Sequence, residues 1–140
     1  MKNYCIIDNE GREYWISRSI AVVVFVFAKD IYGDSYILAE QRGKGTPDPE
    51  YVGKYCVPCG YLDYDETIVQ AAQRELMEET GLNFPISDFK LININDDPYG
   101  DKRIIIVRLM MFSKLCIILL QTKKNILDSL IYIMNRGLIR

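Results

Sequence analysis

Residues 60–82 read GYLDYDETIVQAAQRELMEETGL, and this stretch decides the fold. Its second part, from about residue 66 to residue 80, has apolar residues at the three-to-four spacing of a helix that packs along one face. These apolar residues are Ile68, Val69, Ala72 and Leu76. Gly81 follows directly and predicts a left-handed stop just past the helix end.

The same helix carries a cluster of negative charge. Glu75, Glu78 and Glu79 fall within an arc of about 100°, and Arg74 lies beside Glu78. Two of these carboxylates lie in the last turn, where the helix dipole disfavours them, and such a departure from local rules is typical of a functional site. A hard divalent cation such as Mg²⁺ takes oxygen ligands and would relieve the repulsion. The alternative, a solvated acidic face, leaves Gly60 and the single arginine unexplained.

With these positions in view, the stretch resembles the Nudix box, G-x5-E-x7-R-E-U-x-E-E-x-G-U, in which U is a bulky aliphatic residue. Every specified position is matched, by Gly60, Glu66, Arg74, Glu75, Leu76, Glu78, Glu79, Gly81 and Leu82. The strand pattern extends the resemblance to about residues 18–112. It implies an α/β fold, an α-β-α sandwich with a mixed, curved β-sheet, in a single domain over residues 1–140.

Bulk properties narrow the function. The chain has 140 residues and 49% hydrophobic content, which suits one globular domain with its own core. A net charge of −2 argues against general nucleic-acid binding, and the absence of histidine excludes histidine bases, triads and metal ligands. No apolar leader and no apolar run of about 18 residues is present, so we expect a cytoplasmic protein without a membrane span.

Four cysteines include the pair Cys56 and Cys59 in a C-x-x-C arrangement. No second pair or histidine completes a zinc site, and the pair does not begin a helix as a redox motif would. Packing beside the box is the favoured interpretation. The resemblance adds that the backbone carbonyl of Cys59 helps to bind metal.

The rest of the chain predicts strands joined by turns. A hairpin is expected over residues 3–17 with its turn at residues 9–11, followed by a buried strand and its returning partner. The expected strands after the hairpin are residues 20–28, 36–41, 55–58, 89–94 and 103–112.

A long loop over residues 41–54 contains three glycines and two prolines and is a candidate for substrate binding. Arg42, Lys44 and Lys54 are candidates to meet phosphate oxygens, and Tyr51 or Tyr55 to stack on a base. Arg42 is favoured because it ends a strand directed at the box. Solvated surface residues are the alternative for the others.

An acidic turn follows the predicted strand at residues 89–94. The resemblance makes Asp96, Asp97 and Asp101 candidates for the general base, alongside Glu78, although ordinary turn chemistry also explains these aspartates. Tyr99 is expected to contact substrate. Pro98 and Tyr99 together match the markers of both the ADP-ribose and the dinucleoside polyphosphate subgroups, so the substrate stays open.

Residues 113–140 depart from the family pattern. This tail has one acidic residue against five basic ones, and residues 127–134 are expected to form an apolar helix. A divergent last strand and helix, a frame disruption late in the gene, or a tail that binds a membrane surface or a partner are the alternatives.

The resemblance implies hydrolysis of a nucleoside diphosphate linked to another moiety, with Mg²⁺ or Mn²⁺ as cofactor. Glu75, Glu78 and Glu79 would bind the metal with the Cys59 carbonyl, and the expected catalytic residues are Glu78, Glu75 and an orienting Arg74. Structural roles are expected for Gly60, Glu66 and Gly81. The expected partner is a small nucleotide derivative, not nucleic acid, and a homodimer is one option for assembly. The alternative function is a Nudix-fold sensor that binds a nucleotide without hydrolysing it.

Overall fold

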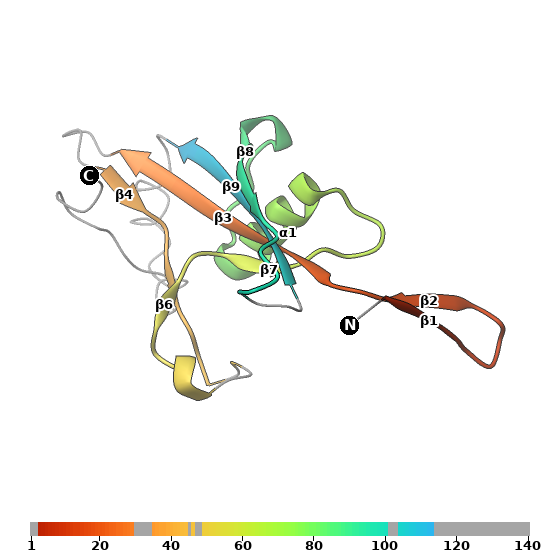
Figure 1. Ribbon diagram of the computed structural model, residues 1–140. Helices are drawn as coiled ribbons and strands as arrows, with labels where there is room; N and C mark the ends of the chain where they lie inside the picture. Colours follow the sequence, from red (N-terminus) through yellow and green to blue (C-terminus); the bar gives the residue numbers. More distant parts are fainter. Residues whose placement is uncertain (1–2, 30–34, 45, 47–48, 101–103, 114–140) are drawn as a thin grey trace.

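The computed structural model describes residues 3–29, 35–44, 46, 49–100 and 104–113. At its centre is a mixed sheet with the strand order β4-β3-β9-β8 (Figure 1). β3 (Ser19–Lys29) pairs in parallel with β9 (Ile104–Ser113), and β9 pairs antiparallel with β8 (Lys90–Asn95). β4 (Ser35–Ile37) and β7 (Cys59–Tyr61) each pair antiparallel with one end of β3. The expected α/β fold is confirmed, and the sheet does not close on itself.

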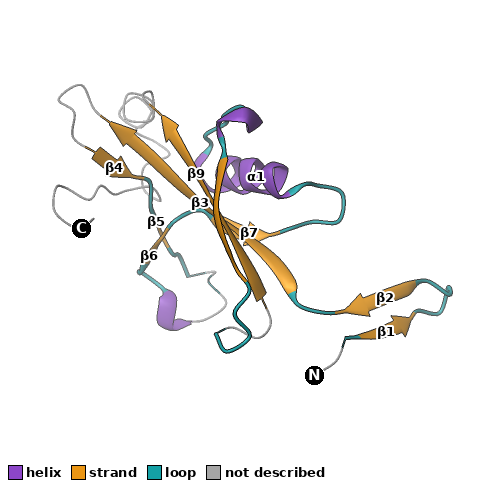
Figure 2. Ribbon diagram, turned by 45° about the horizontal axis from the view of Figure 1, so that its top comes forward, coloured by secondary structure: helices purple, strands orange, loops and turns teal. Residues whose placement is uncertain are grey.

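β3 explains the core. Its alternate residues Val22, Val24 and Val26 are fully buried, because a strand turns every second side chain to the same face. On that face α1 (Ile68–Thr80) crosses the sheet and supplies Ala72 and Leu76, which are also fully buried (Figure 2). The predicted apolar face of the helix is therefore the core face.

α1 begins two residues later than expected. Thr67 is the N-cap, and its hydroxyl accepts the backbone N–H of Gln70 at 3.4 Å while the Gln70 side chain accepts the N–H of Thr67 at 2.8 Å. This reciprocal cap satisfies two backbone donors and leaves Glu66 outside the helix. The helix ends as predicted, with Gly81 at φ 69° donating to the Met77 carbonyl.

Two predicted strands are divided. The strand expected at residues 36–41 is broken into β4 and β5 (Glu40–Gln41), and β5 turns away to pair with β6 (Tyr55–Cys56). The strand expected at residues 55–58 ends at β6, and β7 resumes at Cys59. The buried Pro58 separates them because it has no N–H to donate to a ladder.

The predicted hairpin forms a sheet of its own. β1 (Tyr4–Ile7) pairs with β2 (Glu13–Ile16) and projects from the rest of the described chain (Figures 1 and 2). Its turn is organised by Asp8, which accepts the N–H groups of Glu10 and Arg12 at 2.9 Å, and Gly11 has φ 82°. Apolar side chains on both of its faces are exposed, with Trp15 at 68%.

In the described residues α1 covers one face of the sheet. Besides α1 there are two short 3₁₀ turns, η1 (Pro49–Tyr51) and η2 (Ile86–Asp88). The apolar helix expected at residues 127–134, and with it the second outer layer of the sandwich, lies outside the described residues. No helix in the described ranges has both the length and the hydropathy to span a bilayer.

Candidate active site

The tightest feature of the site is the approach of α1 to β7. Gly60 pairs with Val22 of β3 and lies directly beneath the side chain of Glu75. A Cβ at residue 60 would collide with the Glu75 carboxylate. The first glycine of the box is therefore needed for space, since its backbone φ is not in the left-handed region.

Arg74 organises the acidic face. Its Nη1 donates to Glu75 at 2.6 Å and to Glu78 at 3.2 Å, and its Nη2 donates to Glu66 at 2.6 Å and to the carbonyl of Tyr61 at 2.9 Å. Three of the box glutamates thus share one guanidinium. This arrangement offsets the mutual repulsion that the sequence predicted for the helix face.

Glu66 joins the loop before α1 to this network. Both of its oxygens accept from Arg74, and Oε1 also accepts the backbone N–H of Asp63 at 2.9 Å. The Arg74 hydrogen bonds hold the pKa of Glu66 below its usual value. Glu66 thus links the loop before α1 to Arg74, and its structural role stays a prediction.

Glu79 faces β7 at the other end of the acidic face. Its Oε2 accepts the backbone N–H of Cys59 at 2.9 Å. Burial raises the pKa of Glu79 to about 7, the nearby carboxylates of Glu40 and Glu75 add to the rise, and the Cys59 N–H opposes it. The carboxylates of Glu40 and Glu75 therefore favour a positive charge beside Glu79.

The donor chemistry of this face fits a hard cation. Glu75, Glu78 and Glu79 offer carboxylate oxygens from one side of α1, and Glu78 is 59% exposed. In the described part of the chain, however, no three acidic or cysteine side chains form a ready metal-binding group. Instead, Glu75 is bound to Arg74 and Glu79 to the Cys59 amide.

Arg42 lies beside Cys59, the residue directly before the box. It follows β5, is half-buried, and its Nη2 donates to the Cys59 sulfur at 3.7 Å. Its backbone N–H donates to the Lys54 carbonyl, which fixes the β5–β6 arm. Burial raises the pKa of Cys56 to about 12 and also raises that of Cys59, so both side chains favour the neutral thiol over the reactive thiolate.

The other predicted substrate contacts are exposed side chains. Lys44 is exposed, and Tyr51 lies in η1 with the ammonium of Lys54 4.6 Å from its ring centroid. Tyr99 is 91% exposed in the loop between β8 and β9. In the described part of the chain, none of these three side chains forms a hydrogen bond or ion pair with a box residue, so their substrate roles stay predictions.

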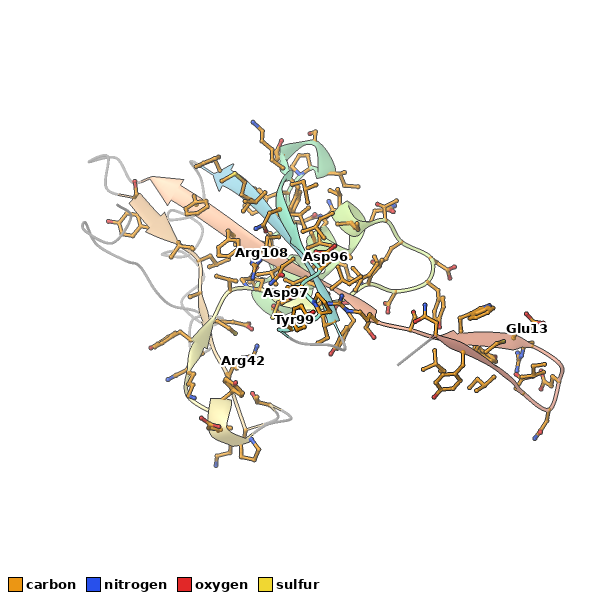
Figure 3. All side chains as sticks on the ribbon, viewed as in Figure 1. Glu13, Arg42, Asp96, Asp97, Tyr99 and Arg108 are labelled. Carbon is orange, nitrogen blue, oxygen red and sulfur yellow. The ribbon has the colours of Figure 1, made fainter. Side chains whose placement is uncertain are left out.

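The acidic turn predicted after β8 is present, and Figure 3 labels its Asp96, Asp97 and Tyr99. Asp97 accepts the N–H of Tyr99 at 2.9 Å, and the Asp96 carbonyl accepts from Arg18 at 2.6 Å. Arg18 also donates to the Ile104 carbonyl, so it ties this loop to the start of β9. A role for Asp96 or Asp97 as general base stays a prediction, and Asp101 lies outside the described residues.

Glu40 was not predicted from the sequence. It stands opposite Cys56 in the β5–β6 ladder and accepts from the Cys56 sulfur at 3.3 Å. Its charge raises the pKa of Cys59 and Glu79. The only signal in the sequence was its spacing of two from Arg42, which places both side chains on one face of a strand.

A comparison with family models decides the assignment. The model for the NUDIX domain matches residues 17–122, well over half of the chain. The chain belongs to the Nudix family. The match begins just before β3 and includes the whole box, so the hairpin of β1 and β2 precedes it.

Solved structures share the fold. A MutT/nudix family protein from Enterococcus faecalis has a TM-score of 0.60 and 22% identity over 69% of this chain, which spans only 37% of that protein. A mutT/nudix family protein from Listeria innocua has a TM-score of 0.55 and 24% identity over 81% of this chain and 76% of its own. The MERS1–RNA complex of T. brucei has a TM-score of 0.58 and 17% identity, over 70% of this chain and 35% of that one.

Proposed function

We propose that this protein is a divalent-metal-dependent pyrophosphohydrolase that cleaves the diphosphate of a nucleoside diphosphate linked to another moiety. The observation that carries the proposal is the grouping of Glu66, Glu75 and Glu78 around Arg74, with Glu79 on the Cys59 amide. A binding surface has no need for four carboxylates at one place. Family membership supports the same reaction class.

The residues of the chain divide the work. Arg74 positions Glu75 and Glu78 by charge-assisted hydrogen bonds, and Gly60 leaves room for Glu75. Bound Mg²⁺ or Mn²⁺, held by Glu75, Glu78, Glu79 and the Cys59 carbonyl, would neutralise phosphate charge and acidify a water. Glu78 is the best placed of the box carboxylates to accept a proton, because it is the most exposed and because in the described residues its side chain accepts one hydrogen bond, from Arg74 at 3.2 Å.

The substrate-binding part of the proposal rests on Arg42. Its half-buried guanidinium beside Cys59 suits a phosphate oxygen. A soluble nucleotide derivative in the cytoplasm is the expected ligand.

The second candidate is a Nudix-fold module that binds a nucleotide without hydrolysing it. One observation favours it: the sequence of residues 113–140 departs from the family pattern, and a site without its usual closing element would bind a nucleotide without hydrolysing it. The RNA-bound relative from T. brucei makes RNA one ligand to include in a test, although a likeness at 17% identity shows the fold alone.

The test is Mg²⁺-dependent release of phosphate, with a coupled phosphatase, over ADP-ribose, nucleotide sugars, dinucleoside polyphosphates and dNTPs. Glu78→Gln removes one charge with little change in shape, and we expect kcat/KM to fall by about 100-fold. Glu13→Gln is the matched control, because Glu13 is exposed on the hairpin. Turnover of no compound by the wild type, with nucleotide or RNA binding still measurable, would favour the binding module.

A further inference from the structure

The sheet face opposite α1 carries an arginine to which no role has yet been given. Val22, Val24 and Val26 point toward α1, so Val23 and Phe25 point to the opposite face. Arg108 of β9 is the register partner of Val23, and the same Val23 pairs with Cys59 of β7 on its other side. Arg108 and Cys59 therefore lie in one cross-strand row on this face.

The spacing of that row links Arg108 to the box. Adjacent strands lie about 4.8 Å apart, so Arg108 is separated from Cys59 by two spacings, about 10 Å between backbones. Cys59 contacts both Arg42 and Glu79. A ligand held at Cys59 can thus extend along the face to Arg108. The long side chain of Arg108 shortens the distance that the ligand has to span.

The charge of Arg108 is not matched by a carboxylate in the described part of the chain. Arg12 and Arg74 form ion pairs there, and Arg18 donates to backbone carbonyls. Arg108 makes one 3.4 Å hydrogen bond, to the side-chain oxygen of Asn93, and Arg42 has only the Cys59 sulfur as a side-chain contact. Both are half-buried, and Figure 3 shows Arg42 on the β5–β6 arm and Arg108 on β9.

The surroundings of Arg108 strengthen an ionic contact. On this face its apolar neighbours are Val23, Phe25 and Met110, which are half-buried, and on the β8 side it meets the exposed Asn93. Apolar neighbours lower the local dielectric and so favour a guanidinium bound to a phosphate or carboxylate over one left in water. The site is thus suited to an anion at a fixed distance from the box.

We propose that Arg108 binds a negatively charged group on the distal moiety of the substrate, so that the protein prefers a nucleoside diphosphate whose second moiety is itself phosphorylated over one with a neutral sugar. This inference rests on the proposed function for the position of the diphosphate at the box. It adds the charge of the second moiety, which the box does not determine.

The test measures binding without turnover. Calorimetry with Mg²⁺ would compare methylene-bridged analogues of diadenosine tetraphosphate and of ADP-ribose, which have a charged and a neutral second moiety. We expect the wild type to bind the diadenosine tetraphosphate analogue more tightly than the ADP-ribose analogue. Arg108→Gln should raise the Kd of the diadenosine tetraphosphate analogue about tenfold or more and change the Kd of the ADP-ribose analogue less than about twofold. Arg108→Lys should recover part of the affinity.

Lys90→Gln is the matched control. Lys90 lies on the same face of the sheet, opposite Met110, in the exposed edge strand β8. Its substitution removes one positive charge, as Arg108→Gln does. The inference would be overturned if Lys90→Gln and Arg108→Gln had equal effects. It would also be overturned if Arg108→Gln weakened the binding of both analogues equally or of neither, or if the wild type bound neither analogue. Turnover is scored separately: analogues that bind while the natural compounds are not hydrolysed would count against the hydrolase and leave Arg108 as a binding residue.

Discussion

Three residues are in close contact where α1 meets the sheet: Gly60, Glu75 and Arg74. Glu75 fits above Gly60 because residue 60 has no Cβ, and its carboxylate is fixed by Arg74 at 2.6 Å. The box pattern therefore specifies close packing at residue 60 as well as the positions of charged residues. Each of the three residue types is required by the position of the other two.

Gly60→Ala tests this packing. The added Cβ would displace the Glu75 carboxylate, and we expect kcat/KM to fall about 10- to 100-fold, with about 1–3 kcal/mol lost from the free energy of unfolding. Steady-state kinetics and urea denaturation measure both quantities. Gly43→Ala is the control, since a Cβ there would meet nothing within 4 Å. Equal activity of the two variants would show that Glu75 has no fixed place in the reaction.

Glu66→Gln tests the link to Arg74 through pH. Because Arg74 lowers the pKa of folded Glu66, the folded protein holds this proton less tightly than the unfolded chain. The ion pair thus stabilises the fold fully above the unfolded pKa, about 4.3, and this stabilisation is lost as pH falls through the folded pKa. Urea denaturation should show the wild type more stable than the variant at pH 7.

The gap between wild type and Glu66→Gln should close as the pH is lowered through and below 4. Glu13→Gln, on the exposed hairpin, is expected to show no comparable gap. A difference for Glu66→Gln that is the same at pH 7 and pH 3 would rule out the ion pair as its cause.

At the scale of elements, the pair of β3 and β9 differs from the β1–β2 hairpin in strand pairing and in burial. β3 pairs with three strands and buries one face under α1, whereas the hairpin pairs only with itself in the described chain. A two-stranded hairpin with both faces in water is marginally stable. The two should therefore differ strongly in local stability.

Hydrogen exchange measured by mass spectrometry tests this difference. We expect amides of β1 and β2 to exchange near the rate of an unstructured chain and those of β3 and β9 to be among the most protected. Protection of the hairpin comparable to that of β3 would contradict the prediction, and would mean that its exposed apolar residues, Trp15 among them, are covered in solution.

Elements with a strong pattern were predicted from sequence. The β-branched run in β3, the turn before β2 and the helix of the box follow from residue spacing, and Gly81 marks the helix end. The helix start was wrong by two residues because the Thr67–Gln70 cap competes with the acidic residue before it. The break between β4 and β5 was missed because it depends on a partner, β6, that lies far along the chain.

The site was predicted less evenly. Helical spacing brings Arg74 and the box glutamates together, and spacing is visible in a sequence. The contacts of Arg42 and Glu40 with Cys59 and Cys56 depend on strand pairing across a long loop, so only Arg42 was proposed. The row that joins Arg108 to Cys59 requires the register of three strands and has no local signal.

At the scale of the whole molecule, the box, the β5–β6 arm and the sheet face beyond Cys59 form one candidate site. The family and the α/β fold are confirmed. The single-domain boundary, the nature of residues 113–140, the absence of nucleic-acid binding and a homodimer stay predictions. A mass measured on the natural protein would show whether the sequence over residues 113–140 is genuine.

Hydrolysis of a diphosphate linkage at the box can be followed by ³¹P NMR of the substrate panel with Mg²⁺. We expect the diphosphate signal of one substrate class to be replaced by signals of two phosphate-bearing products, only with metal and not with Glu78→Gln. Spectra unchanged for every compound, or release in which only one product carries phosphate, would contradict this expectation.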